Sequence, residues 1–103
     1  MQLNFEDALR LGEELFFSRK YGIARVKREL FKKQFSEEVI DRVVEELNPG
    51  LEERHIKHII LNKYGRKIFI DQERDKIVRL MSRFGYPENK TIYVLDSLER
   101  AEL

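Results

Sequence analysis

Seven basic side chains are the best candidates in this chain for binding an anionic partner. They are Arg25, Arg28, Lys32, Lys33, Lys76, Arg79 and Arg83. On a helix, where each residue advances by about 100°, the first three and the last three each fall opposite an apolar stripe. Arginine presents its donors as a rigid fork that suits phosphates and carboxylates. We therefore predict two basic helix faces that bind an acidic protein surface or a nucleic acid.

The alternative interpretation is that both faces are solvated and neutralised by ion pairs within the helix. Between residues 23 and 33, however, Glu29 is the only acid, so the first basic face has few partners on its own helix. We expect that replacing either set of three by alanine leaves thermal stability nearly unchanged, because exposed charges contribute little to it.

Two histidines form the other conceivable ligand set. His55 and His58 lie three residues apart and could touch one metal ion from a shared helix face. The nearby sequence offers no convincing third ligand. We interpret both as surface or boundary histidines and expect neither a metal nor a cofactor.

The remaining candidates favour no catalytic chemistry. Adjacent acids on solvated helices are interpreted as surface residues, namely Glu13, Glu14, Glu45 and Glu46. Four aromatic residues could stack on bases, although packing is the simpler interpretation: Tyr21, Tyr64, Phe69 and Tyr93. The sequence contains no glycine-rich phosphate loop, triad spacing or dinucleotide fingerprint. We predict that the protein is not an enzyme and has no small-molecule substrate.

The composition is that of a globular chain with a heavily charged surface. It has 103 residues, of which 42% are hydrophobic and 38% charged, with a net charge of +1. The lack of cysteine excludes disulfides, cysteine-ligated zinc and cysteine nucleophiles. No apolar run approaches the length of a membrane helix, and the acidic segment 4–7 does not resemble a signal peptide. We expect a cytoplasmic location without membrane contact.

Apolar residues recur at helical spacing in six segments, which position the basic residues. We predict helices over 4–19, 23–33, 36–47, 51–64, 71–84 and 87–98. Asn4 and Ser36 suit N-caps, and Gly22 suits the left-handed residue that ends the first helix. The apolar connector 67–70 could be a strand, which is the weaker interpretation.

The second half of the chain repeats the plan of the first. Asn48-Pro49-Gly50 marks a boundary between domains 1–48 and 49–103. Residues 25–47 align with 76–98 at an offset of 51 without a gap, matching Arg28 with Arg79. We predict an all-α fold of two tandem three-helix repeats, elongated or slightly curved.

These segments resemble a known family. Residues 22–40 combine a glycine, a basic helix ending in Leu30 and a turn before paired aliphatic residues, and they resemble the second repeat of the bacterial regulatory protein RecX. Residues 3–18 resemble the helix that precedes that repeat, and 76–98 resemble the third repeat. The resemblance implies tandem three-helix repeats that bind the RecA recombinase filament and inhibit recombination and DNA repair. For the basic residues it implies contact with RecA or with the DNA that RecA wraps.

The chain departs from the family pattern at two points. The family has three repeats, and the first has no counterpart here, so we expect weaker inhibition. The family has a glycine in the turn. In the first half of this chain Gln34 stands at that position, whereas the second half has Gly85.

Two other functions remain open. The first is direct binding of single- or double-stranded DNA by a helix-turn-helix-like module, although the small net charge and the acidic third helices of the two halves oppose it. The second is a plain scaffold or oligomerisation domain.

Overall fold

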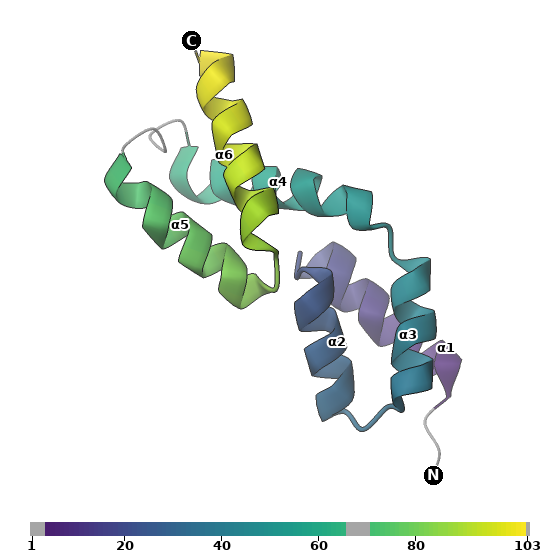
Figure 1. Cartoon of the computed structure of the whole chain (residues 1–103). Helices are drawn as coiled ribbons and strands as arrows, with labels where there is room; N and C mark the ends of the chain where they lie inside the picture. The colour runs from purple at the N-terminus through teal and green to yellow at the C-terminus, as the bar shows by residue number, and fades with distance from the viewer. Residues whose placement is uncertain (1–3, 66–70, 103) are drawn as a thin grey trace.

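The computed structural model describes residues 4–65 and 71–102, and every regular element within them is helical. The elements are α1 (Phe5–Glu13), the π-helix η1 (Glu14–Ser18), α2 (Ile23–Lys32), α3 (Glu37–Glu46), the 3-10 turn η2 (Pro49–Leu51), α4 (Glu52–Tyr64), α5 (Asp71–Phe84) and α6 (Glu88–Glu102) (Figure 1). The predicted all-α class is confirmed. The connector 67–70 lies outside the described residues. Among the helices that are described, none has the length and apolar character to span a bilayer.

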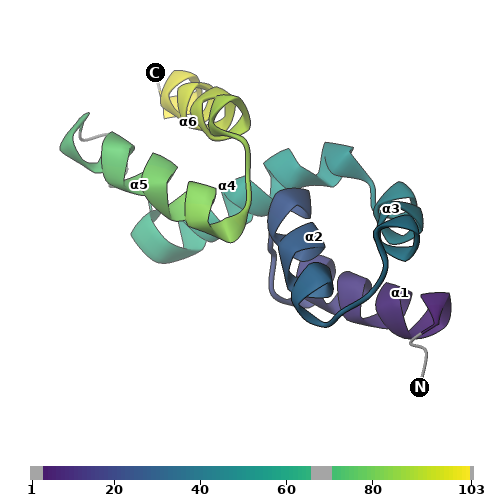
Figure 2. The same cartoon turned by 60° about the horizontal axis from the view of Figure 1, so that its bottom comes forward.

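Two separate apolar cores lie along the molecule. The first lies among α1, η1, α2 and α3 and consists of Ala8, Leu15, Phe16, Val26, Leu30, Phe35, Ile40, Val43 and Leu47. The second lies among α4, α5 and α6 and consists of Ile56, Ile60, Ile77, Met81, Tyr86, Val94, Leu95 and Leu98. We call these parts the first unit and the second unit. Together they form a rod of 54 × 20 × 19 Å, which confirms the expected elongation (Figure 2).

Local capping explains where several helices begin. The Asn4 side chain accepts a hydrogen bond from the Asp7 N–H at 2.9 Å, and the Ser36 hydroxyl accepts one from the Val39 N–H at 3.2 Å. Each bond satisfies an N–H group that has no partner within its own helix. Both predicted N-caps are therefore confirmed.

The end of the first helix differs from the prediction. Residues 14–18 form a π-helix, in which the Arg19 N–H donates to the Glu14 carbonyl at 3.1 Å. Lys20, with φ of 59°, takes the left-handed conformation that we predicted for Gly22. Gly22 instead has φ of −72° and caps α2. A glycine is needed here because the Gly85 backbone leaves no room for a Cβ, and not because of the backbone conformation.

The turns after α2 and α5 have the same backbone geometry. In the first turn, the Gln34 N–H donates to the Phe31 carbonyl and the Phe35 N–H to the Leu30 carbonyl. In the second turn, the Gly85 N–H donates to the Ser82 carbonyl and the Tyr86 N–H to the Met81 carbonyl. Every one of these positions is related by the offset of 51. Gln34 and Gly85 both have positive φ, at 70° and 98°. This agreement supports the internal repeat, whose division at residue 48 stays a prediction.

The two units meet where the end of α5 lies against the start of α2. The Gly22 N–H donates to the Phe84 carbonyl at 2.7 Å. A Cβ on Gly22 would lie 2.3 Å from the Gly85 carbonyl oxygen, and a Cβ on Gly85 would lie 2.4 Å from Cβ of Arg25. Neither contact leaves room for a side chain, so the two glycines permit the backbones to touch.

A buried carboxylate joins the units at the same place. Glu52 is only 4% exposed. It accepts a hydrogen bond from the Ile23 N–H at 3.1 Å and forms an ion pair with Lys90 at 2.8 Å. The carboxylate thus neutralises the positive N-terminal end of α2 while Lys90 compensates its charge. The Tyr86 hydroxyl adds a hydrogen bond to the Lys20 carbonyl. Three of these polar contacts, Gly22–Phe84, Ile23–Glu52 and Tyr86–Lys20, cross between the units and set how they meet.

The glycine contact can be tested by adding one methyl group. We expect Gly22→Ala to lower the free energy of unfolding by about 1–3 kcal/mol, because backbone atoms of Gly85 and Tyr86 must move. Gly50→Ala is the matched control, since its Cβ would approach only the Asn48 side chain, at 3.1 Å. That change should stay within about 0.5 kcal/mol. Urea denaturation of both variants decides, and equal losses would contradict the close contact.

Candidate binding surface

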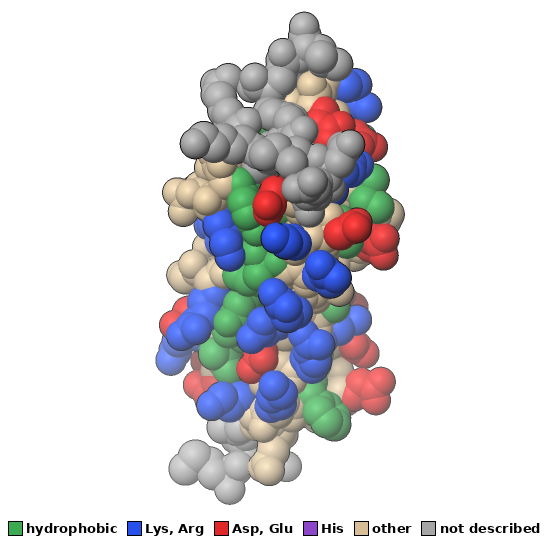
Figure 3. Space-filling model, turned by 90° about the vertical axis from the view of Figure 1, so that its left-hand side faces the viewer, with side chains coloured by type: hydrophobic (Ala, Val, Ile, Leu, Met, Phe, Trp, Pro, Cys, Tyr) green, Lys and Arg blue, Asp and Glu red, His purple; other side chains and the backbone are tan. Residues whose placement is uncertain are grey.

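Lysine and arginine side chains gather on the face of the rod that carries α5 and α2 (Figure 3). Six of the seven predicted site residues are exposed on these helices or just after α2: Arg28, Lys32, Lys33, Lys76, Arg79 and Arg83. They come from both units, so the surface crosses the junction. The structure therefore brings the two predicted basic segments onto one side of the molecule.

Arg25 is the exception among the predicted site residues. Its side chain is 28% exposed, and its guanidinium lies 4.1 Å from the centre of the Tyr21 ring. Nη1 donates to the Arg83 carbonyl at 2.9 Å, so Arg25 caps the C-terminal end of α5. The helical spacing correctly predicted that Arg25 faces away from the first core, but the second unit packs against that side of α2. These contacts argue against our expectation that Arg25 can be removed without loss of stability, and unfolding of the variant tests it.

The first basic face is also less free than predicted. Glu29 forms ion pairs with both Arg25 and Lys32, each at 3.5 Å. One carboxylate therefore serves two of the three basic residues. On α5, Lys76 lies 3.9 Å from Glu73. The two faces consequently differ in how much positive charge they leave for a partner.

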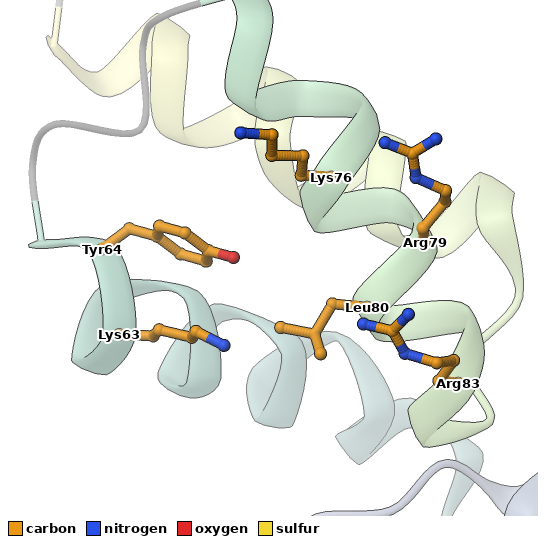
Figure 4. A pocket seen from close by; sticks show the side chains of 6 residues that line it. All are labelled: Lys63, Tyr64, Lys76, Arg79, Leu80 and Arg83. Carbon is orange, nitrogen blue, oxygen red and sulfur yellow. The ribbon is translucent and has the colours of Figure 1, made fainter.

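A basic hollow of about 270 Å³ lies between the end of α4 and α5 (Figure 4). It is lined by Lys63, Tyr64, Lys76, Arg79, Leu80 and Arg83. Sequence reasoning found three of its four cations but missed Lys63, which lies on another helix and outside the repeat alignment. Tyr64 was noted only as an aromatic residue. We call this site the basic hollow.

A second hollow, of about 400 Å³, lies between α2 and α3 and has mixed character. Its lining residues are Ala24, Lys27, Arg28, Phe31, Glu37, Ile40 and Asp41. Phe31 is 71% exposed, which is unusual for so large an apolar side chain in a chain with two formed cores. We call this site the mixed hollow. Sequence reasoning missed Phe31, although its place outside the apolar stripe of α2 was a usable signal.

The histidines divide between core and surface. His58 is exposed, whereas His55 is 6% exposed and packs beside Phe16, with ring centres 4.8 Å apart. Our interpretation of His55 as a surface or boundary residue is wrong, because the first unit covers this part of α4. Nδ1 of His55 is buried and lacks a hydrogen-bond partner among the described atoms. Within residues 4–65 and 71–102, no three histidine, cysteine or acidic side chains are grouped to hold a metal.

The other candidate residues have varied surroundings. The four surface acids predicted at 13, 14, 45 and 46 are exposed, as expected. Tyr21 packs edge-on against Phe84, with ring centres 5.7 Å apart. Tyr93 is 56% exposed, so its expected packing role is wrong. Phe69 lies outside the described residues.

Comparisons with known proteins leave the surface to be interpreted from its own geometry. No family model, curated protein or solved structure matches the chain. The resemblance to RecX consequently rests on the sequence motifs of residues 3–40 and 76–98 alone.

The structural role of Arg25 separates it from its neighbours on α2. We expect Arg25→Ala to lower the free energy of unfolding by about 1–2 kcal/mol, because the α5 carbonyl loses a charged donor. Arg28→Ala removes the same charge from an exposed position and should change it by less than about 0.5 kcal/mol. Thermal and urea unfolding of the two variants measure the difference. A stable Arg25 variant would return this residue to the binding surface.

His55 should make stability depend on pH. Burial, and then the charge of Lys20, lowers the pKa of His55 below its ordinary 6.5; Glu52 opposes this shift, while His58 and Arg54 add to it. Protonation therefore favours the unfolded chain, and this contribution to stability, complete above pH 6.5, is lost as the pH falls below it. We expect His55→Leu to flatten the stability profile in this range, and His58→Leu to change it much less, because His58 is a smaller cause of the shift than burial. Urea midpoints at several pH values provide the measurement, and an unchanged slope in the His55 variant would refute this account.

Proposed function

We propose that the chain is a non-catalytic regulator that docks on a RecA-type recombinase filament and inhibits recombination. The docking surface is the face that carries α2 and α5. The observation that carries the proposal is Phe31, which stands exposed in the mixed hollow beside Lys27 and Arg28. The resemblance to RecX names the partner.

Phe31 has the chemistry of an anchor for a protein partner. Aromatic and arginine side chains are enriched at the energetically important positions of protein interfaces. The mixed hollow contains both, together with the carboxylates of Glu37 and Asp41. Such a mixture of charges suits a protein surface better than a polyanion, because the two acids would repel phosphates. This supports contact with the recombinase itself.

The junction supports docking on a repeating lattice. Because backbone contacts and Glu52 hold the units together, α2 and α5 are presented with a defined orientation along a rod 54 Å long. Two contacts on a preorganised rod lose less entropy on binding than two contacts joined by a flexible linker. They also act at a high effective concentration once one has formed. A filament, which repeats its subunits, offers further contact sites along the length of the rod.

The test is inhibition of the cognate recombinase on single-stranded DNA. We expect the protein to bind the filament and slow ATP hydrolysis, and Phe31→Ala to weaken binding by about tenfold or more. Stability should be unchanged, since Phe31 lies outside the core. Tyr93→Ala removes another exposed aromatic residue, from α6, and should change binding by less than about twofold.

Parallel titrations with naked DNA distinguish the alternatives. Binding that requires the recombinase supports the proposal. Equal affinity for naked DNA and for the filament would favour direct DNA binding, and a steep salt dependence would accompany it. If neither binds in low salt, the chain is not a recombinase regulator.

A further inference from the structure

We infer that the basic hollow of the second unit is a phosphate-binding site. The ligand is a phosphate group, carried either by the backbone of a nucleic acid or by a small phosphate compound. This inference goes beyond filament docking, which the mixed hollow of the first unit mediates. It rests on the charge, shape and donor arrangement of the basic hollow alone.

The charge of the lining has a single sign. Four of its six residues are cationic, and the other two are Tyr64 and Leu80. No carboxylate is among the described residues of the lining, in contrast to the mixed hollow with Glu37 and Asp41. Among the described side chains, Lys76 is the one cation of the four with an ion pair, at 3.9 Å from Glu73. Positive charge thus concentrates in a concave site, where the field is strongest.

The donors converge from two helices. In Figure 4, the Lys63 ammonium and the Tyr64 hydroxyl extend from α4 toward α5, and the Arg83 guanidinium extends from α5 toward Leu80, while the Lys76 ammonium ends apart from these three. Arg79 stands at the edge with its guanidinium turned away from α4. A phosphate oxygen between the helices could therefore accept from ammonium, guanidinium and hydroxyl groups together. Such charge-assisted hydrogen bonds are stronger than neutral ones.

The size of the hollow fits a phosphate group that keeps part of its hydration. At about 30 Å³ per water molecule, a volume of about 270 Å³ corresponds to several waters. It is too open and too polar to select an apolar ligand, and Leu80 is the sole aliphatic residue of the lining. The Tyr64 ring also offers a flat surface on which a base next to the phosphate could stack.

The two basic faces therefore have different ligands, although the sequence makes them look equivalent. At the offset of 51, Arg79 corresponds to Arg28 and Arg83 to Lys32. In the first unit Lys32 is held by Glu29, and Arg28 lines a hollow with two acids. In the second unit the matching arginines line a hollow without acids. The phosphate site consequently belongs to the second unit alone.

The experiment is a titration of the protein, without any recombinase, with inorganic phosphate in low salt. Backbone amide signals in a ¹⁵N-labelled sample report the site. We expect saturable shifts confined to residues 63–65 and 76–83. Lys63→Ala/Arg83→Ala removes one donor from each helix and should weaken binding by about tenfold or more. Arg54→Ala/Lys57→Ala removes the same charge from exposed positions of α4 and should weaken it by less than about twofold.

A labelled single-stranded oligonucleotide of about eight thymidines identifies the source of the phosphate. Tighter binding than inorganic phosphate, lost in the hollow variant with a shallower salt dependence, assigns the site to a nucleic-acid backbone. If the protein binds phosphate and pyrophosphate but does not bind the oligonucleotide, the site is assigned to a small phosphate compound. The single variant Lys63→Ala, at an exposed position, keeps the test valid if the double variant unfolds.

Two results would overturn the inference. One is the absence of saturable shifts with either ligand. The other is an equal loss in the hollow variant and in the α4 control, which would mean that the ligand senses only the diffuse charge of the surface. Either result leaves filament docking through Phe31 intact, because that docking is measured with the recombinase present and with a variant of the other unit.

Discussion

The close approach of Gly22 and Gly85 is the constraint on which the rest of the molecule depends. At this point the start of α2 and the end of α5 share a backbone hydrogen bond of 2.7 Å, and neither residue has room for a Cβ. The two small cores never merge, so this contact and its surroundings determine how the units are placed relative to each other. Without it, each unit would present its basic helix independently, and the rod would lose its shared face.

Charged side chains strengthen this contact from both directions. Arg25 of the first unit donates to the Arg83 carbonyl at the end of α5, and Glu52 at the start of the second unit caps the N-terminus of α2. Each charge lies at the helix end whose dipole it complements, so the attraction between the side chain and the helix acts over a short distance. Lys90 balances Glu52 and thereby avoids an unpaired buried carboxylate. Part of the high charge content of the chain is therefore structural.

The charges left at the surface divide the rod into two chemically different halves. In the first unit, acids from α3 and Glu29 moderate the basic face and leave Phe31 exposed among them. In the second unit, cations from α4 and α5 line the basic hollow, and none of its described lining residues is acidic. Repeated backbone geometry has thus been combined with divergent side chains. A partner that offers protein surface and phosphate side by side would contact both halves, and the rigid junction would keep the two contacts in register.

The sequence by itself determined most of the helices, the N-caps Asn4 and Ser36 and the related turns, because these depend on residues within a few positions of one another. Apolar spacing located the core residues Val26, Leu30 and Val43, and the offset of 51 located equivalent turns at Gln34 and Gly85. Only the tertiary structure decided what Arg25, His55 and Lys63 do, since contacts between units or between separate helices have no period in the sequence. Arg25 looked like a solvent-facing cation until the second unit covered it, and Lys63 joined the basic residues of α5 only through packing of α4 beside them.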